Sequence, residues 1–523
     1  MKTMDSTSSN VQASSDVQDS THRPVERGGL IASEGPAGAP GVDVEDLYTL
    51  SPMQQGMLFH ILSAPEDRLY LDQTLCTILG ELEEGPFRAA WQRVVDRHPA
   101  LRTGFLWQGL SKPLQVVYRH ATLDFESHDW RQLSPKVQKA QLEAFLREDR
   151  QRGFDLRQAP LMRVHVLRLG ERSYRVLWTV YHLVVDAWCS TTVLTEVVRC
   201  YEAFRRGEEP DLPAVQPYRN FIRWLKEREV DEDEDFWRSY LEGFRRPTPV
   251  AQHAKGDSWP GLGSGHRHER LELSEGETRR LKELARERHL TLGTLIQGAW
   301  GLLLSYRSEQ EDVVFGTTVS GRPAELPGAT ETVGLFINTL PHRLRVEPRA
   351  ELMPWLREIQ QRQLEVRERE QTPLHRIQSW SELEGASSLF HSIVVFLNVA
   401  DLAQQDTGSL YIKDMRYVGR PHLPLTVNVF PGRQLSVEMV YEVRRFRWAE
   451  VRRWLDQLET LLQSMAEYPE ATLGEILETL RTHEQERRSD QRRRRRDSNS
   501  GMLRITRPVA VKLTDIDPPS SSS

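Results

Sequence analysis

Cysteine is scarce in this chain, which has only three among 523 residues, and this limits the covalent frameworks it can build. The three are Cys76, Cys189 and Cys200, and no two of them are spaced as C-x-x-C. Disulfide-rich small domains and cysteine zinc knuckles both need cysteines in closely spaced pairs. We therefore predict reduced thiols, no disulfide framework and no metal site, as suits a cytoplasmic protein.

Long apolar runs are also missing. No stretch approaches the roughly 20 apolar residues that a membrane-spanning helix needs. Residues 1–43 are rich in Ser, Gly, Asp and Pro and contain no apolar segment of signal-peptide length. The formal net charge is −6, which gives no reason to expect a nucleic-acid partner. We predict a cytoplasmic protein with no membrane and no nucleic-acid partner.

The chain has enough apolar residues for a core and is too long for one simple core. Hydrophobic residues make up 38% of it, and its length favours two domains or a duplicated pair. The arginine run at 492–496 favours a solvated end over a site for RNA or an acidic partner. Composition predicts a disordered leader at 1–43, a first lobe at 44–234, a loop-like connection at 235–264, a second lobe at 265–480 and a charged, disordered tail at 481–523.

Helical and strand patterns alternate along both lobes, which indicates an α+β fold. Helical patterns predict helices at 53–62, 86–98, 277–287, 294–306 and 448–465, a long one after Trp188, and a charged surface helix at 136–152. Apolar and β-branched runs predict strands at 161–169, 174–185, 312–319, 338–346, 392–398, 425–430 and 435–441.

One apolar stretch leads to a histidine and an aspartate. Residues 180–188 read V-Y-H-L-V-V-D-A-W, with His182 and Asp186 four residues apart. Imidazole can transfer a proton near neutral pH, and a strand rich in Val and Leu can hold it rigidly. From this spacing alone, a hydrogen-bonded core histidine is the commoner explanation.

Further segments favour a catalytic histidine because together they resemble one family. The stretch at 180–188 resembles the His-His-x-x-x-Asp-Gly signature of condensation domains from nonribosomal peptide synthetases. Other blocks are similar to motifs of that family and follow in its order over roughly residues 44–480. They are the opening motif L-S-P-M-Q-Q-G-M-L-F-H at 50–60, R-H-P-A-L-R-T-G-F at 97–105, the strand entry at 154–163, a latch-like G-T-T-V-S-G-R-P at 316–323, V-G-L-F-I-N-T-L-P at 333–341 and Y-E-V-R-R-F at 441–446.

The resemblance implies a fold and an activity. Family members have two lobes like chloramphenicol acetyltransferase, arranged as a V-shaped pseudo-dimer with a tunnel between them. They join a donor acyl or aminoacyl thioester to an acceptor amine, or occasionally a hydroxyl, forming an amide or ester. Substrates arrive on the phosphopantetheine arms of carrier proteins, with no bound cofactor. The chain shows no adenylation or carrier domain, so the resemblance implies a free-standing enzyme that works in trans with carrier proteins and other synthetase subunits.

The resemblance also assigns roles to residues. His182 is the catalytic candidate, as a base or as a group that positions the attacking amine. Asp186 is expected to form an ion pair that holds the loop, with Arg102 and Arg163 as candidate partners. Tyr181 and Ala187 replace the first His and the Gly of the signature. Residues expected to support, line or brace the site or tunnel are Tyr181, Ala187, Trp188, Ser320, Arg322 and Asn338.

The two departures leave a second function open. If the turn needs a positive φ, Ala187 is strained there by about 1 kcal/mol or more. A condensation-like domain that has lost catalysis would instead recruit a tailoring enzyme or carrier protein, with residues 502–511 as a docking strand. Simple acyl transfer from coenzyme A is a third and weaker interpretation. Cys189 as a nucleophile has no supporting signal in the sequence.

Overall fold

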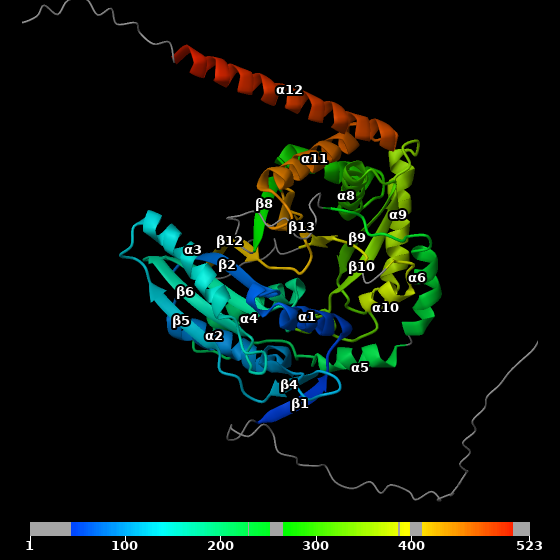
Figure 1. Ribbon diagram of the computed structural model, residues 1–523. Helices are drawn as coiled ribbons and strands as arrows, with labels where there is room; N and C mark the ends of the chain where they lie inside the picture. Colours follow the sequence, from blue (N-terminus) through cyan, green and yellow to red (C-terminus); the bar gives the residue numbers. More distant parts are fainter. Residues whose placement is uncertain (1–42, 229, 251–264, 385–387, 398–409, 506–523) are drawn as a thin grey trace, which may run out of the picture. The chain divides into compact units, whose positions relative to one another are not determined.

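The computed structural model describes residues 43–228, 230–250, 265–384, 388–397 and 410–505 (Figure 1). These residues belong to one compact unit that begins at Asp43, so the predicted leader lies almost wholly outside them. Among the helices of the described ranges, none combines the length and the apolar character needed to cross a membrane.

The amino-terminal half is built on a five-stranded sheet with the order β12-β2-β7-β6-β5, beside a small three-stranded sheet with the order β1-β4-β3. Four of the five strands come from this half, and β12 comes from the other. The elements of this half are β1 Val44–Thr49, α1 Pro52–Ser63, β2 Leu71–Leu79, α2 Glu84–Arg97, β3 Thr103–Leu106, β4 Leu114–Tyr118, β5 Asp124–Asp129, α3 Pro135–Arg152, β6 Met162–Gly170, β7 Ser173–Tyr181, α4 Ala187–Arg205, α5 Arg219–Glu227 and α6 Glu234–Tyr240.

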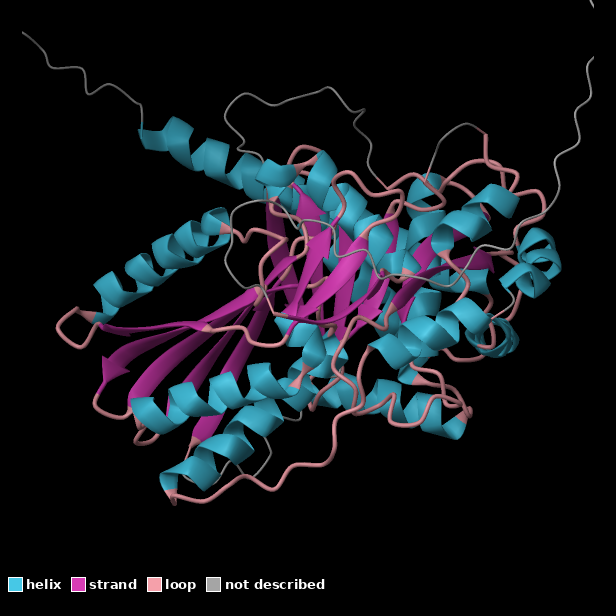
Figure 2. Ribbon diagram, turned by 90° about the horizontal axis from the view of Figure 1, so that it is seen from below, coloured by secondary structure: helices cyan, strands magenta, loops and turns pink. Residues whose placement is uncertain are grey.

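Helices cover both faces of the five-stranded sheet (Figure 2). On one face, Trp178 of β7 packs against Trp91 of α2 with ring centroids 5.6 Å apart. On the other face, Thr179 donates a hydrogen bond of 2.6 Å to Asp149 of α3. Because neighbouring residues of a strand point to opposite faces, β7 is buried on both sides and can hold the turn after it firmly.

The carboxy-terminal half is built on a six-stranded sheet with the order β10-β9-β11-β13-β14-β8. Val313 and Phe315 of β9 enter one apolar core, whereas Val314 enters another that contains Trp237 of α6. The elements of this half are β8 His266–Glu272, α7 Glu275–Glu287, α8 Leu292–Ser308, β9 Asp312–Val319, β10 Asn338–Arg345, α9 Leu352–Arg367, α10 Leu374–Trp380, β11 Ser392–Phe396, β12 Tyr411–Val418, β13 Leu425–Phe430, β14 Ser436–Glu442, α11 Trp448–Glu467 and α12 Leu473–Ile505.

Two segments of the carboxy-terminal half pack into the amino-terminal half. Strand β12 pairs antiparallel with β2, from Tyr411 opposite Leu79 to Val418 opposite Gln73. The segment 320–337 contributes buried side chains such as Val333 and Phe336 to the amino-terminal core. The two halves therefore share a sheet and a core.

The structure differs from the sequence prediction at three places. Strand β7 ends at Tyr181, so residues 182–185 form a turn and not the end of a strand. Helix α6 lies at the start of the segment predicted as a loop-like connection, because Trp237 has an apolar core to enter. Helix α12 extends to Ile505, so the structure places a helix where the sequence predicts a disordered tail from residue 481 and a docking strand from residue 502.

Candidate active site

His182 is the first residue after β7, in a turn that leads to α4. Its backbone N–H donates to the carbonyl of Tyr70 (2.9 Å), and its ring Nδ1 lies 2.5 Å from the carbonyl oxygen of Val185. A carbonyl only accepts hydrogen bonds, so in the neutral ring Nδ1 carries the proton and Nε2 keeps its lone pair. Gln54 of α1 holds the same turn by donating 2.9 Å to the carbonyl of Leu183. The turn thus fixes both the place and the tautomer of this imidazole.

Asp72 of β2 is a buried carboxylate beside His182 that no sequence motif had marked. Its Oδ2 lies 4.0 Å from Nδ1 of His182, and the residue is only 5% exposed. Burial raises the pKa of Asp72, while His182, a hydrogen bond from Tyr417 and the charge of Arg150 act against that rise. The available signal was the only charged residue of this strand, since charged groups are rarely buried without a role.

Asp186 caps α4 and ties it to the carboxy-terminal half. Its Oδ1 accepts a hydrogen bond from the backbone of Cys189 (2.9 Å), and its Oδ2 accepts one from the backbone of Phe336 (3.1 Å). Nη2 of Arg322 lies 3.2 Å from both carboxylate oxygens, and both side chains are almost fully buried. The ion-pair partner of Asp186 is therefore Arg322, and neither Arg102 nor Arg163.

The two arginines predicted as partners hold other parts of the amino-terminal half. Arg102 lies 2.6 Å from Glu45 and also donates to backbone carbonyls, including that of Asp96. Arg163 lies 2.5 Å from Oδ1 of Asp149 and stacks over the ring of Phe154 at 4.4 Å. Because both guanidiniums are held by acceptors in their own surroundings, neither pairs with Asp186.

Glycines allow the segment that carries Arg322 to approach α4. Gly321 has a φ of +61°, and a Cβ there would lie 1.9 Å from the carbonyl oxygen of Phe336. A Cβ at Gly334 would lie 2.1 Å from the ring of Tyr218. These positions admit only glycine at the observed backbone geometry, so the motifs at 316–323 and 333–341 are required to bring Arg322 to Asp186.

The two departures from the family signature occupy unstrained positions. Tyr181 is buried, packs against the ring of Phe154 at 5.8 Å and hydrogen-bonds Arg68, with its pKa raised by burial. Ala187 is the first residue of α4, and its φ is not among the positive values of the described chain. The prediction of backbone strain at Ala187 is therefore wrong, because the residue begins a helix and does not need a left-handed backbone.

The remaining candidates divide between the turn and its surroundings. Trp188 is half exposed and donates through Nε1 to the carbonyl of Thr330 (3.0 Å). Asn338 begins β10 and donates to the carbonyls of Glu370 and Thr372 (2.9 and 2.8 Å), which makes it a brace. Ser320 is exposed.

Cys189 is unsuited to act as a nucleophile. Burial, followed by the nearby charge of Asp186, raises the pKa of its thiol to about 12, so the thiolate is not populated near neutral pH. The sulfur instead lies 3.1 Å from Nη2 of Arg322 and accepts from the backbone of Gly334 (3.3 Å). Its place is in the packing around the Asp186 ion pair.

A second group of polar rings adjoins His182 through Tyr70. The Tyr70 hydroxyl contacts Nδ1 of His422, whose ring stacks on His60 at 4.2 Å. Burial, followed by the charge of His60, lowers the pKa of His422 to about 3, and burial also lowers the pKa of His60. Both imidazoles are thus neutral at pH 7 and offer hydrogen-bonding groups without charge. Neither motif spacing nor periodicity in the sequence relates His422 to this site.

Known proteins share most of this chain's sequence pattern. A model of the condensation domain family matches residues 44–487. One of the linear gramicidin synthase subunits of Brevibacillus parabrevis is 39% identical over 457 residues, which cover 85% of this chain and 6% of that protein. Surfactin synthase subunit 3 of Bacillus subtilis strain 168 is 31% identical over 439 residues, which cover 83% of this chain and 34% of that protein. The chain thus spans a small part of the length of these relatives.

Solved structures share the fold. The first condensation domain of the calcium-dependent antibiotic synthetase, in complex with a substrate analogue, has a TM-score of 0.71 at 17% identity and covers 83% of this chain and 99% of its own. A mutant starter condensation domain of rhizomide synthetase, in complex with C8-CoA, has a TM-score of 0.70 at 18% identity. The match covers 82% of this chain and 96% of that domain. The predicted α+β fold with two lobes like chloramphenicol acetyltransferase is thereby confirmed.

Proposed function

The chain belongs to the condensation domain family of nonribosomal peptide synthetases, and from this premise we propose that it catalyses condensation. The acceptor amine attacks the carbonyl carbon of a donor acyl or aminoacyl thioester. A C–N bond forms, the C–S bond breaks, and the donor carrier is released as a free thiol. The product is an amide, or an ester where the acceptor is a hydroxyl.

The observation that carries this proposal is the fixed tautomer of His182. The hydrogen bond from Nδ1 to the Val185 carbonyl leaves Nε2 as the acceptor that a reacting amine needs. Nε2 takes the proton that the amine nitrogen loses as the C–N bond forms. It then passes this proton to the departing thiolate, which becomes the thiol and leaves the imidazole neutral again. The buried carboxyl of Asp72, 4.0 Å from Nδ1, favours the transient imidazolium when it is ionised.

The Asp186–Arg322 pair acts as a positioning device. It joins the first turn of α4 to the segment 320–337, so the His182 turn is held from both halves of the chain. A buried ion pair with this many hydrogen bonds has essentially one geometry, which suits a site that must place two substrates within reacting distance.

Carrier proteins are the proposed partners, because condensation domains take thioesters carried on phosphopantetheine. We treat these arms as substrates, and no resident cofactor enters the mechanism. Action as a free-standing enzyme in trans and a cytoplasmic location stay predictions.

Recruitment of a tailoring enzyme without catalysis has less support. Its motivation lay in Tyr181 and Ala187, and the structure places the first in a packed core and the second in an ordinary helical turn. Part of its proposed docking strand, residues 502–505, is helical.

The decisive experiment follows intact masses of donor and acceptor carrier proteins incubated with the full chain. We expect loss of the acyl mass from the donor and its gain on the acceptor. His182→Ala should lower the rate at least about 100-fold, which is the lower range for losing a general base. His120→Ala, at an exposed histidine of the same half, is the matched control. A His182→Ala protein that folds normally and condenses at the parent rate would refute the proposal.

A further inference from the structure

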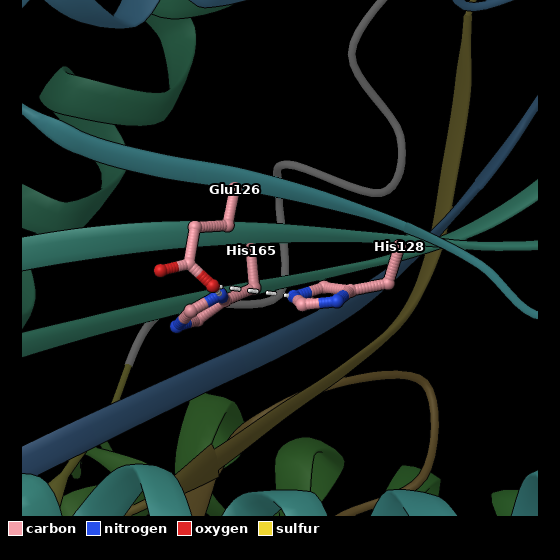
Figure 3. Close-up of side chains that lie close together, drawn as sticks. All are labelled: Glu126, His128 and His165. Atoms are coloured by element: carbon pink, nitrogen blue, oxygen red, sulfur yellow. Dashed lines mark ion pairs between the residues drawn. The ribbon is translucent and has the colours of Figure 1, made fainter.

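Three potential metal ligands lie close together on the five-stranded sheet (Figure 3). They face α3, whose Phe145 and Asp149 contact them. Glu126 and His128 are two residues apart on β5 and therefore share a face. His165 of β6 lies directly opposite Glu126 in the parallel pairing of the two strands. One ligand atom from each of the three lies within 4.8 Å of the others.

An unpartnered nitrogen points into this group. His165 is 3% exposed, and its Nδ1 has no hydrogen-bond partner although it lies 3.6 Å from Oε2 of Glu126. Its other nitrogen, Nε2, lies 3.3 Å from Oδ1 of Asp149 and donates to it. Donation through Nε2 leaves Nδ1 of the neutral ring as a lone pair. A buried acceptor without a donor is costly, so Nδ1 requires a partner that the protein does not supply.

His128 also has a ring nitrogen without a hydrogen-bond partner near Glu126. Its Nε2 is buried without a hydrogen-bond partner and lies 3.5 Å from the same Glu126 oxygen. A neutral imidazole can offer this nitrogen as a lone pair to a metal ion.

The separations suit a tetrahedral ion. Metal–nitrogen and metal–oxygen bonds of about 2.0–2.2 Å place neighbouring ligands of a tetrahedron about 3.3 Å apart. The two histidine–carboxylate distances exceed this value by only about 0.2–0.3 Å. The ligand nitrogens of His128 and His165 lie within 4.8 Å of one another, so the partly exposed His128 ring has to turn toward His165 when an ion binds.

The surroundings resemble a metal site in their outer layer as well. A carboxylate that orients a ligating histidine through its far nitrogen is the usual support for such a ligand, and Asp149 occupies that place. Phe145 of α3 packs edge-on against both imidazoles, at 5.2 and 5.0 Å, and shields them. Arg152 is the nearby cation, 3.8 Å from Oε1 of Glu126, the oxygen that does not face the histidines. Glu126 is half exposed and leaves a path from solvent.

We propose that Glu126, His128 and His165 bind one divalent transition-metal ion of the zinc class, with solvent completing its coordination. Two imidazoles and one carboxylate are a ligand set that Zn²⁺ accepts. The ion joins the edge strand β5 to β6. His165 pairs with Leu177, five residues before His182, and a rise of about 3.3 Å per residue puts the two positions roughly 16 Å apart along β7. Its role is thus to stabilise the sheet and not to take part in condensation.

The test titrates ZnCl₂ into the untagged, chelator-treated full chain by calorimetry and records visible spectra with CoCl₂. We expect one equivalent of Zn²⁺, a Co²⁺ spectrum typical of tetrahedral coordination and a rise in Tm that saturates at one equivalent. His128→Ala and Glu126→Gln alter partly exposed side chains and should each weaken Zn²⁺ binding more than about tenfold. His120→Ala should leave binding unchanged.

Three results would overturn the site. The first is Zn²⁺ binding by His128→Ala with parent affinity and stoichiometry. The second is equal weakening by His120→Ala, which would show only adventitious binding to surface histidines. The third is failure of the parent to bind Zn²⁺ or Co²⁺ at one equivalent, whatever the condensation assay shows.

Discussion

Two aspartates buried on opposite faces of the five-stranded sheet have opposite protonation tendencies. Asp149 is 6% exposed and Asp72 is 5% exposed, so depth of burial does not distinguish them. Burial alone would raise the pKa of Asp149, but donation by His165, Arg163 and Thr179 holds it well below its usual range. The pKa of Asp72 is raised, because burial outweighs the groups around it.

The number and closeness of donors decide this difference. Asp149 lies within 2.7 Å of donors from Arg163, Thr179 and Gln73. Asp72 has a hydrogen bond with Tyr417, while His182 remains 4.0 Å away. The first carboxylate is therefore part of the scaffold, and the second is poised to respond to a charge that appears on His182. Four substitutions test this contrast.

The largest effect is expected at Arg163. Arg163→Met leaves the Asp149 carboxylate buried without its guanidinium and should lower the free energy of unfolding by about 3–5 kcal/mol. Urea unfolding measures the loss. Arg152→Met, which breaks an exposed pair with Asp124, should cost less than about 1 kcal/mol. Equal losses in the two variants would mean that Asp149 does not depend on Arg163.

The loss in Arg163→Met should depend on pH. The pKa of Asp149 is lower in the folded chain than its ordinary value of 3.8, so the stability it contributes is fully present above that value and disappears as the pH falls through the folded pKa. The difference between parent and variant should therefore shrink from about pH 5 to about pH 2. A difference that stays constant over this range in urea unfolding would contradict the ionised state of Asp149.

Removing one hydroxyl donor from each carboxyl group compares directly how much Asp149 and Asp72 depend on their hydrogen bonds. Thr179→Val removes a donor from an ionised Asp149 and should cost about 1.5–3 kcal/mol at pH 7. Tyr417→Phe removes the hydrogen bond to Asp72 and should cost about 1 kcal/mol. Thermal unfolding of both variants gives the ranking, and the reverse order would remove the distinction between scaffold and responsive carboxylate.

The smallest expected change in the free energy of unfolding is a gain, and it concerns Asp72. A raised folded pKa means that the stability Asp72 contributes is full below its ordinary value of 3.8 and is lost as the pH rises through the folded pKa. Asp72→Asn cannot ionise and should be slightly more stable than the parent at pH 8, with the gain vanishing below pH 3.8. The condensation rate should fall at the same time. If Asp72→Asn were less stable than the parent at pH 8, the groups around Asp72 would already offset the cost of burying its ionised form.

Much of the secondary structure could be predicted from the sequence. The predicted strands at 312–319 and 425–430 coincide with β9 and β13, because each is a short run rich in Val, Thr and Phe, and prolines flank the second on both sides. The turn after β7 was placed too late because Leu183, Val184 and Val185 are apolar. They are buried in the turn itself, so their apolar character does not signal a strand.

From the sequence, site residues could be related to one another only where they belong to the same motif. His182 and Asp186 lie together in the sequence, whereas Arg322 lies 136 residues from Asp186 and was named only as a tunnel candidate. Asp72 and Tyr417 belong to β2 and β12, which become neighbours only through sheet order. Pairing between distant segments depends on tertiary packing, which local pattern does not encode.

The pairing of β12 with β2 has a consequence for how the chain is made and engineered. During synthesis the ribosome completes residues 71–79 long before residues 411–418 exist, so the outer edge of β2 waits without its neighbour. Unpaired edges invite association between chains, and such distant contacts form slowly. Nascent or truncated chains that end before residue 411 should therefore aggregate. A chimaera joined between residues 320 and 410 would combine β2 of one parent with β12 of another, and its success would depend on how well those two edges match.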